Sequence, residues 1–375
     1  MEDRLQYLIT ANSEDNRVQW AKDWKKQGKK VIGILSSEVP EEVIAAAGML
    51  PFRITGTWSE NISHARVYRT ENSCGYCNHV LESFLNHDLD FLDGVVIGDI
   101  DQDLVRLWDV LQAIQIKPFC HIMHIPFVDS VLNIRFFTEE ISRLINALEV
   151  FNGRAVSDDA LNATIETFNQ TRQLLSHVYE LRKKEIPPLS GADVLGLTTA
   201  ATIMPKEIYN RELEALLPFL DEHQATIKHF HPRILITSEM LDHPAYLALV
   251  EENCLVAMDD MDTGSRYFNL AVDTTSKDPV EALAKRYLCR QGAPRMANWD
   301  KQIEQIMTWV KAFNIDGVIG LPLTWCHPQN YRMPFMKEKL KQVGIPSISL
   351  DRAYHPANFG QLRTRIGAFV EMLGS

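Results

Sequence analysis

The sequence lacks the features that define several common classes of protein. No run approaches the roughly 20 uninterrupted apolar residues that a membrane helix needs. The first thirty residues are charged, without the apolar stretch and small-residue cleavage site of a signal peptide. Lys and Arg number 38 against 49 Asp and Glu, a net charge of −11, so no basic excess favours nucleic acid. We therefore expect a cytoplasmic protein with no membrane and no nucleic-acid partner.

Phosphate-binding glycine motifs are absent as well. The chain contains neither a G-x-G-x-x-G sequence nor a Walker A sequence. A Rossmann dinucleotide site and an ATPase centre are therefore not expected in this chain. If ATP takes part in the reaction, we expect a partner subunit to bind it.

Cysteine is sparse and scattered. A large chain without an export signal is expected to keep its cysteines as thiols, so disulfide bridges are not predicted. Burial, metal binding and catalysis remain as roles for these side chains. The six residues are Cys74, Cys77, Cys120, Cys254, Cys289 and Cys326.

The pattern of apolar residues predicts the fold class. At 375 residues the chain is too long for one core of ordinary size. Short apolar runs alternate with helical segments in both halves, which is typical of parallel βαβ units. Long amphipathic helices fill the stretch between the halves. We expect an α/β fold with two parallel-sheet lobes joined by a helical segment, divided into residues 1–137, 138–230 and 231–375. A site is expected in the crevice between the carboxyl ends of both sheets.

Two cysteines stand just before a predicted helix, in a C-x-x-C pattern made by Cys74 and Cys77. Backbone N–H groups at a helix N-terminus stabilise a thiolate, which favours metal ligation or redox chemistry. Two partly buried thiols in a tight turn are the structural alternative. No second local pair completes a zinc site.

Two further cysteines lie beside predicted strands. Cys326 follows the strand at 318–320, and loops after parallel strands commonly carry sites. Cys120 falls inside or at the end of the strand at 118–122, where a small buried side chain is the simpler interpretation. Thiolates gathered from distant loops into one crevice would suit an iron–sulfur cluster better than zinc.

Polar residues mark the same edge of the predicted sheets. Ser36 follows the first strand, Asp99 and Asp101 follow the strand at 94–98, and His124 follows the strand at 118–122. At least one of the two aspartates is expected to cap a helix. Ser36 and Arg266 are candidate cofactor-binding residues. Arg266 would contact an anionic group, with a surface ion pair as the alternative.

The order of several motifs resembles the 2-hydroxyacyl-CoA dehydratase and benzoyl-CoA reductase family, and most of all the smaller, non-ATPase, cluster-bearing subunits of ATP-dependent benzoyl-CoA reductases. The resemblance covers nearly the whole chain. The matching stretches are SEVPEEVIAAAGMLP at 37–51, CGY at 74–76, DGVV at 93–96, GSRYF at 264–268, DGVI at 316–319, CHP at 326–328, GIP at 344–346 and QLRTRIGAFVE at 361–371.

The resemblance implies two flavodoxin-like lobes and a [4Fe-4S] cluster held by three cysteines in the crevice between them. The first ligand of the family matches Cys74, with Cys77 as a competitor, and the third matches Cys326. The second ligand commonly stands where this sequence has Ile100, which cannot coordinate iron. Cys77 or Cys120 would then supply the missing thiolate, with Cys120 slightly favoured. The remaining option is a non-thiolate ligand such as Asp101 or His121.

The resemblance also implies a reaction and partners. The chain would belong to the catalytic core of an aromatic acyl-CoA reductase, with a homologous second core subunit, ATP-hydrolysing activator subunits and ferredoxin as electron donor. Adding an electron to an aromatic thioester needs a low-potential donor, exclusion of water and a proton donor. His79, His124 and His327 are candidates for that donor. The alternatives are a 2-hydroxyacyl-CoA dehydratase subunit and a cluster-poor structural partner.

Overall fold

The structure is a computed structural model that describes residues 1–223, 231–290, 297, 299–357 and 359–374. Its described strands form two four-stranded sheets, and every pairing in them is parallel. The strand orders are β2-β1-β3-β4 and β6-β5-β7-β8, so both lobes share one plan, as predicted. The strands are β1 (Val31–Ile34), β2 (Leu50–Arg53), β3 (Gly94–Gly98), β4 (Phe119–Met123), β5 (Arg233–Ser238), β6 (Leu255–Met261), β7 (Gly317–Gly320) and β8 (Ser347–Ser349).

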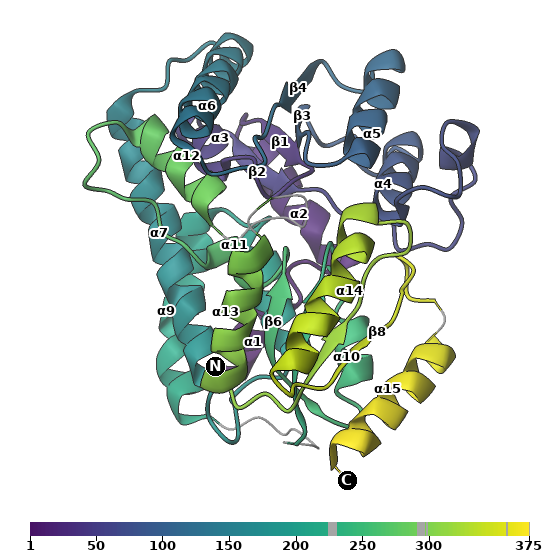
Figure 1. Cartoon of the computed structure of the whole chain (residues 1–375). Coiled ribbons are helices and arrows are strands. Elements are labelled where there is room, and N and C mark those ends of the chain that lie inside the picture. The colour runs from purple at the N-terminus through teal and green to yellow at the C-terminus, as the bar shows by residue number, and fades with distance from the viewer. Residues whose placement is uncertain (224–230, 291–296, 298, 358, 375) are drawn as a thin grey trace.

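Helices surround both sheets, and α7 and α9 run along one side of the molecule past both lobes (Figure 1). Within the described ranges no helix is both long and apolar enough to cross a membrane. The helices are α1 (Glu2–Ile9), α2 (Glu14–Lys25), α3 (Glu41–Ala46), the 3₁₀ turn η1 (Ala65–Val67), α4 (Gly75–Leu85), α5 (Gln102–Ala113), α6 (Val131–Asn152), α7 (Asp158–Leu181), α8 (Gly191–Ala201), α9 (Lys206–Glu222), α10 (Ala245–Val250), α11 (Ser265–Phe268), α12 (Pro279–Cys289), α13 (Trp299–Ala312), α14 (His327–Gln342) and α15 (Phe359–Gly374).

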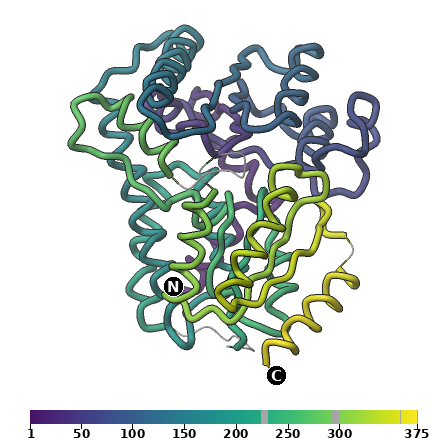
Figure 2. Tube along the Cα trace, viewed as in Figure 1, coloured from purple at the N-terminus to yellow at the C-terminus, as the bar shows by residue number. Residues whose placement is uncertain are grey.

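Some helices pack against elements that are distant in the sequence. Helix α1 packs against α8 and α9, and α12 packs against α6 of the first lobe. Apolar residues of α12 such as Leu283 accordingly share a core with Ile141 and Phe137 of α6. The trace in Figure 2 shows the chain passing from the first lobe through the long helices to the second. The predicted boundaries at 137 and 230 stay a prediction, and residues 224–230 lie outside the described residues.

Three elements differ from the sequence-based expectation. The first thirty residues form α1 and α2 instead of one helix, because the chain turns between Ile9 and Glu14. Strand β2 was not predicted, since it holds Pro51 and lies just after Gly48. Helix α8 was not predicted either, because it is buried nearly all round and therefore shows no amphipathic pattern.

Candidate functional site

A buried cavity lies where the carboxyl ends of the two sheets face each other. Side chains from both lobes line it, including Cys74, Ile100 and Asp101 from the first lobe and Glu239 and Cys326 from the second. The centre of a water molecule can reach about 50 Å³ of this space, so the cavity is narrow. The predicted crevice between the strand ends therefore exists.

Cys74 stands at the N-cap position of α4, only 6% exposed, and its thiol makes no capping hydrogen bond. Cys77 lies in the first turn of the same helix and is fully buried. A hydrogen bond with Cys74, followed by burial, raises the pKa of the Cys77 thiol well above its usual value. Cys77 is not one of the residues that line the cavity.

Cys326 reaches the cavity from the second lobe. It follows β7 through the loop at 321–325 and is the N-cap residue of α14, again without a side-chain capping bond. Burial raises the pKa of its thiol well above the usual value, and Cys74, Glu239 and Asp101 add to that shift. The structure thus brings together two of the predicted ligands, Cys74 and Cys326, on one cavity.

Ile100 and Asp101 lie directly after β3, at the position where the resemblance implies a ligand. Ile100 presents an apolar side chain to the cavity. Asp101 is the N-cap of α5, and its Oδ1 accepts a hydrogen bond of 2.8 Å from the Leu104 amide. The expectation that one of the two aspartates caps a helix is confirmed. Asp99 has a different role, because its Oδ1 accepts a hydrogen bond from the Ile125 amide.

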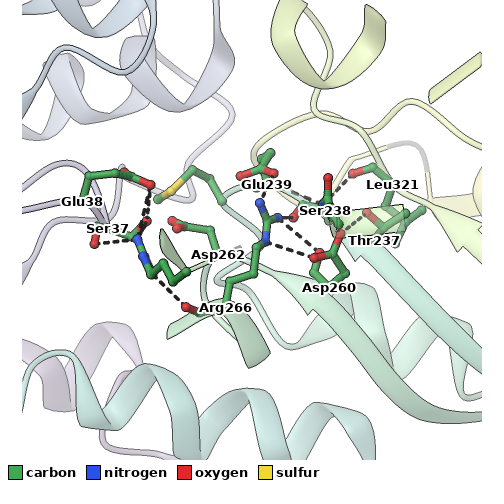
Figure 3. A network of polar contacts seen from close by, with 12 residues as sticks. Ser37, Glu38, Thr237, Ser238, Glu239, Asp260, Asp262, Arg266 and Leu321 are labelled. Carbon is green, nitrogen blue, oxygen red and sulfur yellow. Dashed lines mark hydrogen bonds and ion pairs between the residues drawn. The ribbon is translucent and has the colours of Figure 1, made fainter. Parts of the chain in front are cut away.

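An ion-pair network supports the second-lobe wall of the cavity (Figure 3). The Arg266 guanidinium contacts Glu239 Oε1 through Nη1 at 2.5 Å, and its Nη2 donates to the Ser238 carbonyl at 2.6 Å. Its Nε lies 3.3 Å from Asp260 Oδ1. The alternative of a surface ion pair for Arg266 is wrong, because this arginine is 2% exposed. Internal carboxylates already engage the guanidinium, which orients Glu239 toward the cavity.

Burial dominates the protonation of Glu239. Burial raises the pKa of this carboxyl to about 8. The negative charges of Asp262 and Asp260 add to the rise, and the positive charge of Arg266 opposes it. Across the cavity, Arg53 at the end of β2 pairs with Asp262 after β6 and ties the two lobes together. No motif in the sequence singled out Glu239, Arg53 or Asp262. Glu239 and Asp262 follow strands, so the rule of strand carboxyl ends could have found them.

Cys120 lies inside its strand and away from the cavity, so the alternative that placed it at the strand end is wrong. It is the second residue of β4, three residues before the carboxyl end at Met123. Its thiol lies 3.7 Å from the carbonyl oxygen of Lys117, and it does not line the cavity. His121, one residue further along the strand, does not line the cavity either.

The three candidate proton donors also lie off the cavity lining. His124 is exposed, and its Nδ1 lies 2.8 Å from Asp99 Oδ2. His327 is exposed in the first turn of α14 and stacks on Tyr331. His79 is buried in α4 with Nδ1 2.8 Å from the Thr57 carbonyl, and burial lowers its pKa to about 4.

Ser36 is fully buried just after β1, beside the cavity-lining Leu35. Its hydroxyl oxygen has no hydrogen-bond partner among the described residues. Gly98 at the end of β3 makes room for it, because a Cβ at that position would come within 2.4 Å of the Ser36 oxygen. Ser36 therefore sits at the predicted edge but does not itself line the cavity.

The thiols of the cavity fit a cluster better than a single metal ion. Among the described residues, no three His, Cys, Asp or Glu side chains are grouped closely enough to hold a single metal ion. A four-iron cluster is several ångströms across, so its ligands stand further apart than those of one ion. Cys74 and Cys326 offer two soft thiols on opposite walls, which fits a cluster. The flexible Met240 side chain on the lining would have to move to make room.

Comparison with known proteins identifies the family. The sequence model of the family described as "2-hydroxyglutaryl-CoA dehydratase, D-component" matches residues 36–373. The chain belongs to this family. All the cavity-lining residues named above except Leu35 lie within the matched range.

Three curated relatives are similar to this member of the family over nearly its whole length. A benzoyl-CoA reductase subunit of Thauera aromatica is 26% identical, over 96% of this chain and 95% of its own. The (R)-phenyllactyl-CoA dehydratase beta subunit of Clostridium sporogenes is 25% identical, over 94% of each chain. The beta subunit of (R)-2-hydroxyglutaryl-CoA dehydratase from Acidaminococcus fermentans is 27% identical, over 93% of this chain and 94% of its own. All three are named as enzyme subunits.

Proposed function

We propose that this chain is a subunit of the catalytic core of an ATP-dependent, ferredoxin-fed reductase of benzoyl-CoA or a related aromatic acyl-CoA. In this role it carries a [4Fe-4S] cluster. The observation that carries the proposal is the meeting of Cys74 and Cys326, one thiol from each lobe, on one buried cavity. The similarity to a benzoyl-CoA reductase subunit along nearly the whole chain supports the choice of reaction.

Cys74 and Cys326 would hold the cluster, which supplies single electrons at low potential when bound. Both thiols stand at helix N-caps, where the helix dipole favours the thiolate form. Leu35 and Leu323 add apolar surface to the lining of the cavity. Burial raises the pKa of the Glu239 carboxyl to about 8, and the ion pair with Arg266 opposes that rise.

The proposed reaction adds two electrons and two protons to the aromatic ring and leaves a cyclic diene thioester. The chain has no phosphate-binding glycine motif, so ATP hydrolysis would take place on activator subunits. Ferredoxin would deliver electrons to those activators. A homologous second core subunit would complete the substrate site.

Two other functions have observations in their favour. The similarity to two dehydratase beta subunits supports a 2-hydroxyacyl-CoA dehydratase, in which the electron is recycled and water is eliminated. Ile100 at a ligand position supports a cluster-poor structural subunit that closes the neighbouring active site.

One experiment separates the three functions. The full chain is purified anaerobically with its partner core subunit and activator, then supplied with ATP, reduced ferredoxin and either benzoyl-CoA or an (R)-2-hydroxyacyl-CoA. We expect ATP-dependent oxidation of ferredoxin and a diene product with benzoyl-CoA. Water elimination alone would assign a dehydratase. Full turnover by a complex that holds the Cys74→Ser, Cys326→Ser double variant would assign a structural role.

A further inference from the structure

Three side chains that can bind metal as anions occupy equivalent places around the cavity. Cys74, Asp101 and Cys326 are the N-cap residues of α4, α5 and α14, and all three line the cavity. These helices are 11, 12 and 16 residues long, so each N-terminus favours a negative charge beside it. Two ligands come from the first lobe and one from the second.

The other candidates for a third ligand are placed less well. Cys120 is near the amino end of β4, away from the cavity. Cys77 is fully buried, is hydrogen-bonded to Cys74 and is absent from the cavity lining. Glu239 lines the cavity but is held by Arg266 at 2.5 Å. Ile100 has no atom that can coordinate iron.

Asp101 differs from these residues in two respects. It is the N-cap residue of α5, directly after β3, and it lines the same cavity as Cys74 and Cys326. The hydrogen bond from the Leu104 amide to Oδ1 fixes the orientation of the carboxyl group. The carboxylate is therefore already placed on the cavity wall, and binding a metal there would need no change in the backbone.

We propose that the Asp101 carboxylate is the third ligand of the iron–sulfur cluster, beside the thiolates of Cys74 and Cys326. This inference rests on the proposed function, because it assumes that the chain carries a cluster. Carboxylate is a harder ligand than thiolate and prefers harder metal ions. The Asp101 carboxylate would therefore hold its iron more weakly than a cysteine thiolate at the same position.

The test uses the full chain, reconstituted anaerobically with iron and sulfide, and four variants. Asp101→Asn removes the anionic oxygen but keeps the helix cap, since Asn and Asp cap equally well. Asp101→Cys places a thiolate at the same position. Cys77→Ser and Cys120→Ser are matched controls that remove thiols away from the cavity. Iron and acid-labile sulfide are counted, and electron paramagnetic resonance identifies the cluster type.

In Asp101→Asn, which keeps only the two thiolate ligands, we expect clearly less bound iron and sulfide and a weaker four-iron signal than in the parent chain, at an unchanged melting temperature of the iron-free protein. Asp101→Cys should keep all the iron with an altered spectrum. Cys77→Ser and Cys120→Ser should match the parent chain. A four-iron spectrum unchanged in Asp101→Asn, or cluster loss in Cys77→Ser, would overturn the assignment of Asp101 but leave the proposed function standing. A parent chain that binds no iron would instead refute the proposed function, and this inference with it.

Discussion

Cys74 and Cys326 belong to different lobes and line one buried cavity, each at the N-cap of a helix that follows the carboxyl edge of a sheet. The similar plan of the two lobes explains this meeting, because each sheet directs its strand ends toward the same crevice. Contacts that tie the lobes together should therefore matter for stability as well as for the site.

The ion pair between Arg53 and Asp262 is one such contact. Both side chains are 8% exposed and come from different lobes. Arg53→Met should lower the free energy of unfolding by about 3–5 kcal/mol, because it leaves a buried carboxylate without its partner. The double variant Arg53→Met, Asp262→Leu should lose clearly less, since no charge is then buried alone. Urea unfolding of the three proteins measures the difference, and equal losses in the single and double variants would contradict it.

Gly196 allows the close approach of α1 to α8. A Cβ at this position would come within 2.6 Å of the Ile9 carbonyl oxygen, a backbone atom that cannot move aside cheaply. Gly196→Ala should therefore destabilise the protein by about 1–3 kcal/mol. Gly367 in α15 is the matched control, because nothing lies within 4 Å of an added Cβ there. Gly367→Ala should stabilise by about 0.5–1 kcal/mol, and thermal melting should move the two variants in opposite directions.

His79 should make stability depend on pH. Burial lowers its pKa to about 4, below its ordinary value of 6.5. The unfolded chain then binds the proton more tightly than the folded one, so stability is full above pH 6.5 and is lost as the pH falls toward 4. We expect a loss of at most about 3 kcal/mol from this residue. In His79→Gln that part of the pH dependence should vanish, and a parallel pH profile in both proteins would refute this.

The purified chain should neither bind ATP tightly nor hydrolyse it, because it has no glycine-rich phosphate loop. Equilibrium dialysis with labelled ATP and a phosphate-release assay check this directly. ATP hydrolysis should appear only when the activator subunits are added. Substantial ATP turnover by this chain alone would show that it holds a nucleotide site without a glycine motif.

The sequence predicted the elements whose patterns are local. The strand predicted at 94–98 is observed as β3 with the same bounds, because a short apolar run between two glycines marks it clearly. Helix α8 escaped detection because burial on every side removes the contrast between two faces. The packing of α12 on the first lobe also escaped, since an amphipathic pattern shows which face is buried but not what covers it.

The candidate site could be predicted only in part, again because sequence patterns describe local structure and not what packs against it. Cys74 and Cys326 could be placed at strand ends and helix starts from their neighbours in the sequence. The position of Cys120 stayed open between the interior and the end of its strand, because the apolar run at 118–122 marks the strand but not which of its side chains reach the cavity. The rule of strand carboxyl ends could have placed Glu239 at the cavity, but its burial and its pairing with Arg266 depend on contacts that the sequence does not show.

The central claim is that two thiols from opposite lobes hold an iron–sulfur cluster. Iron and acid-labile sulfide content of the anaerobically purified full chain tests it most directly, with Cys326→Ser beside Cys254→Ser as a control. Cys254 is a fully buried thiol outside the cavity, hydrogen-bonded to the Val250 carbonyl. We predict about four iron and four sulfide per chain, retained in Cys254→Ser and mostly lost in a folded Cys326→Ser protein. A folded parent chain without iron, or equal iron in both variants, would contradict the claim.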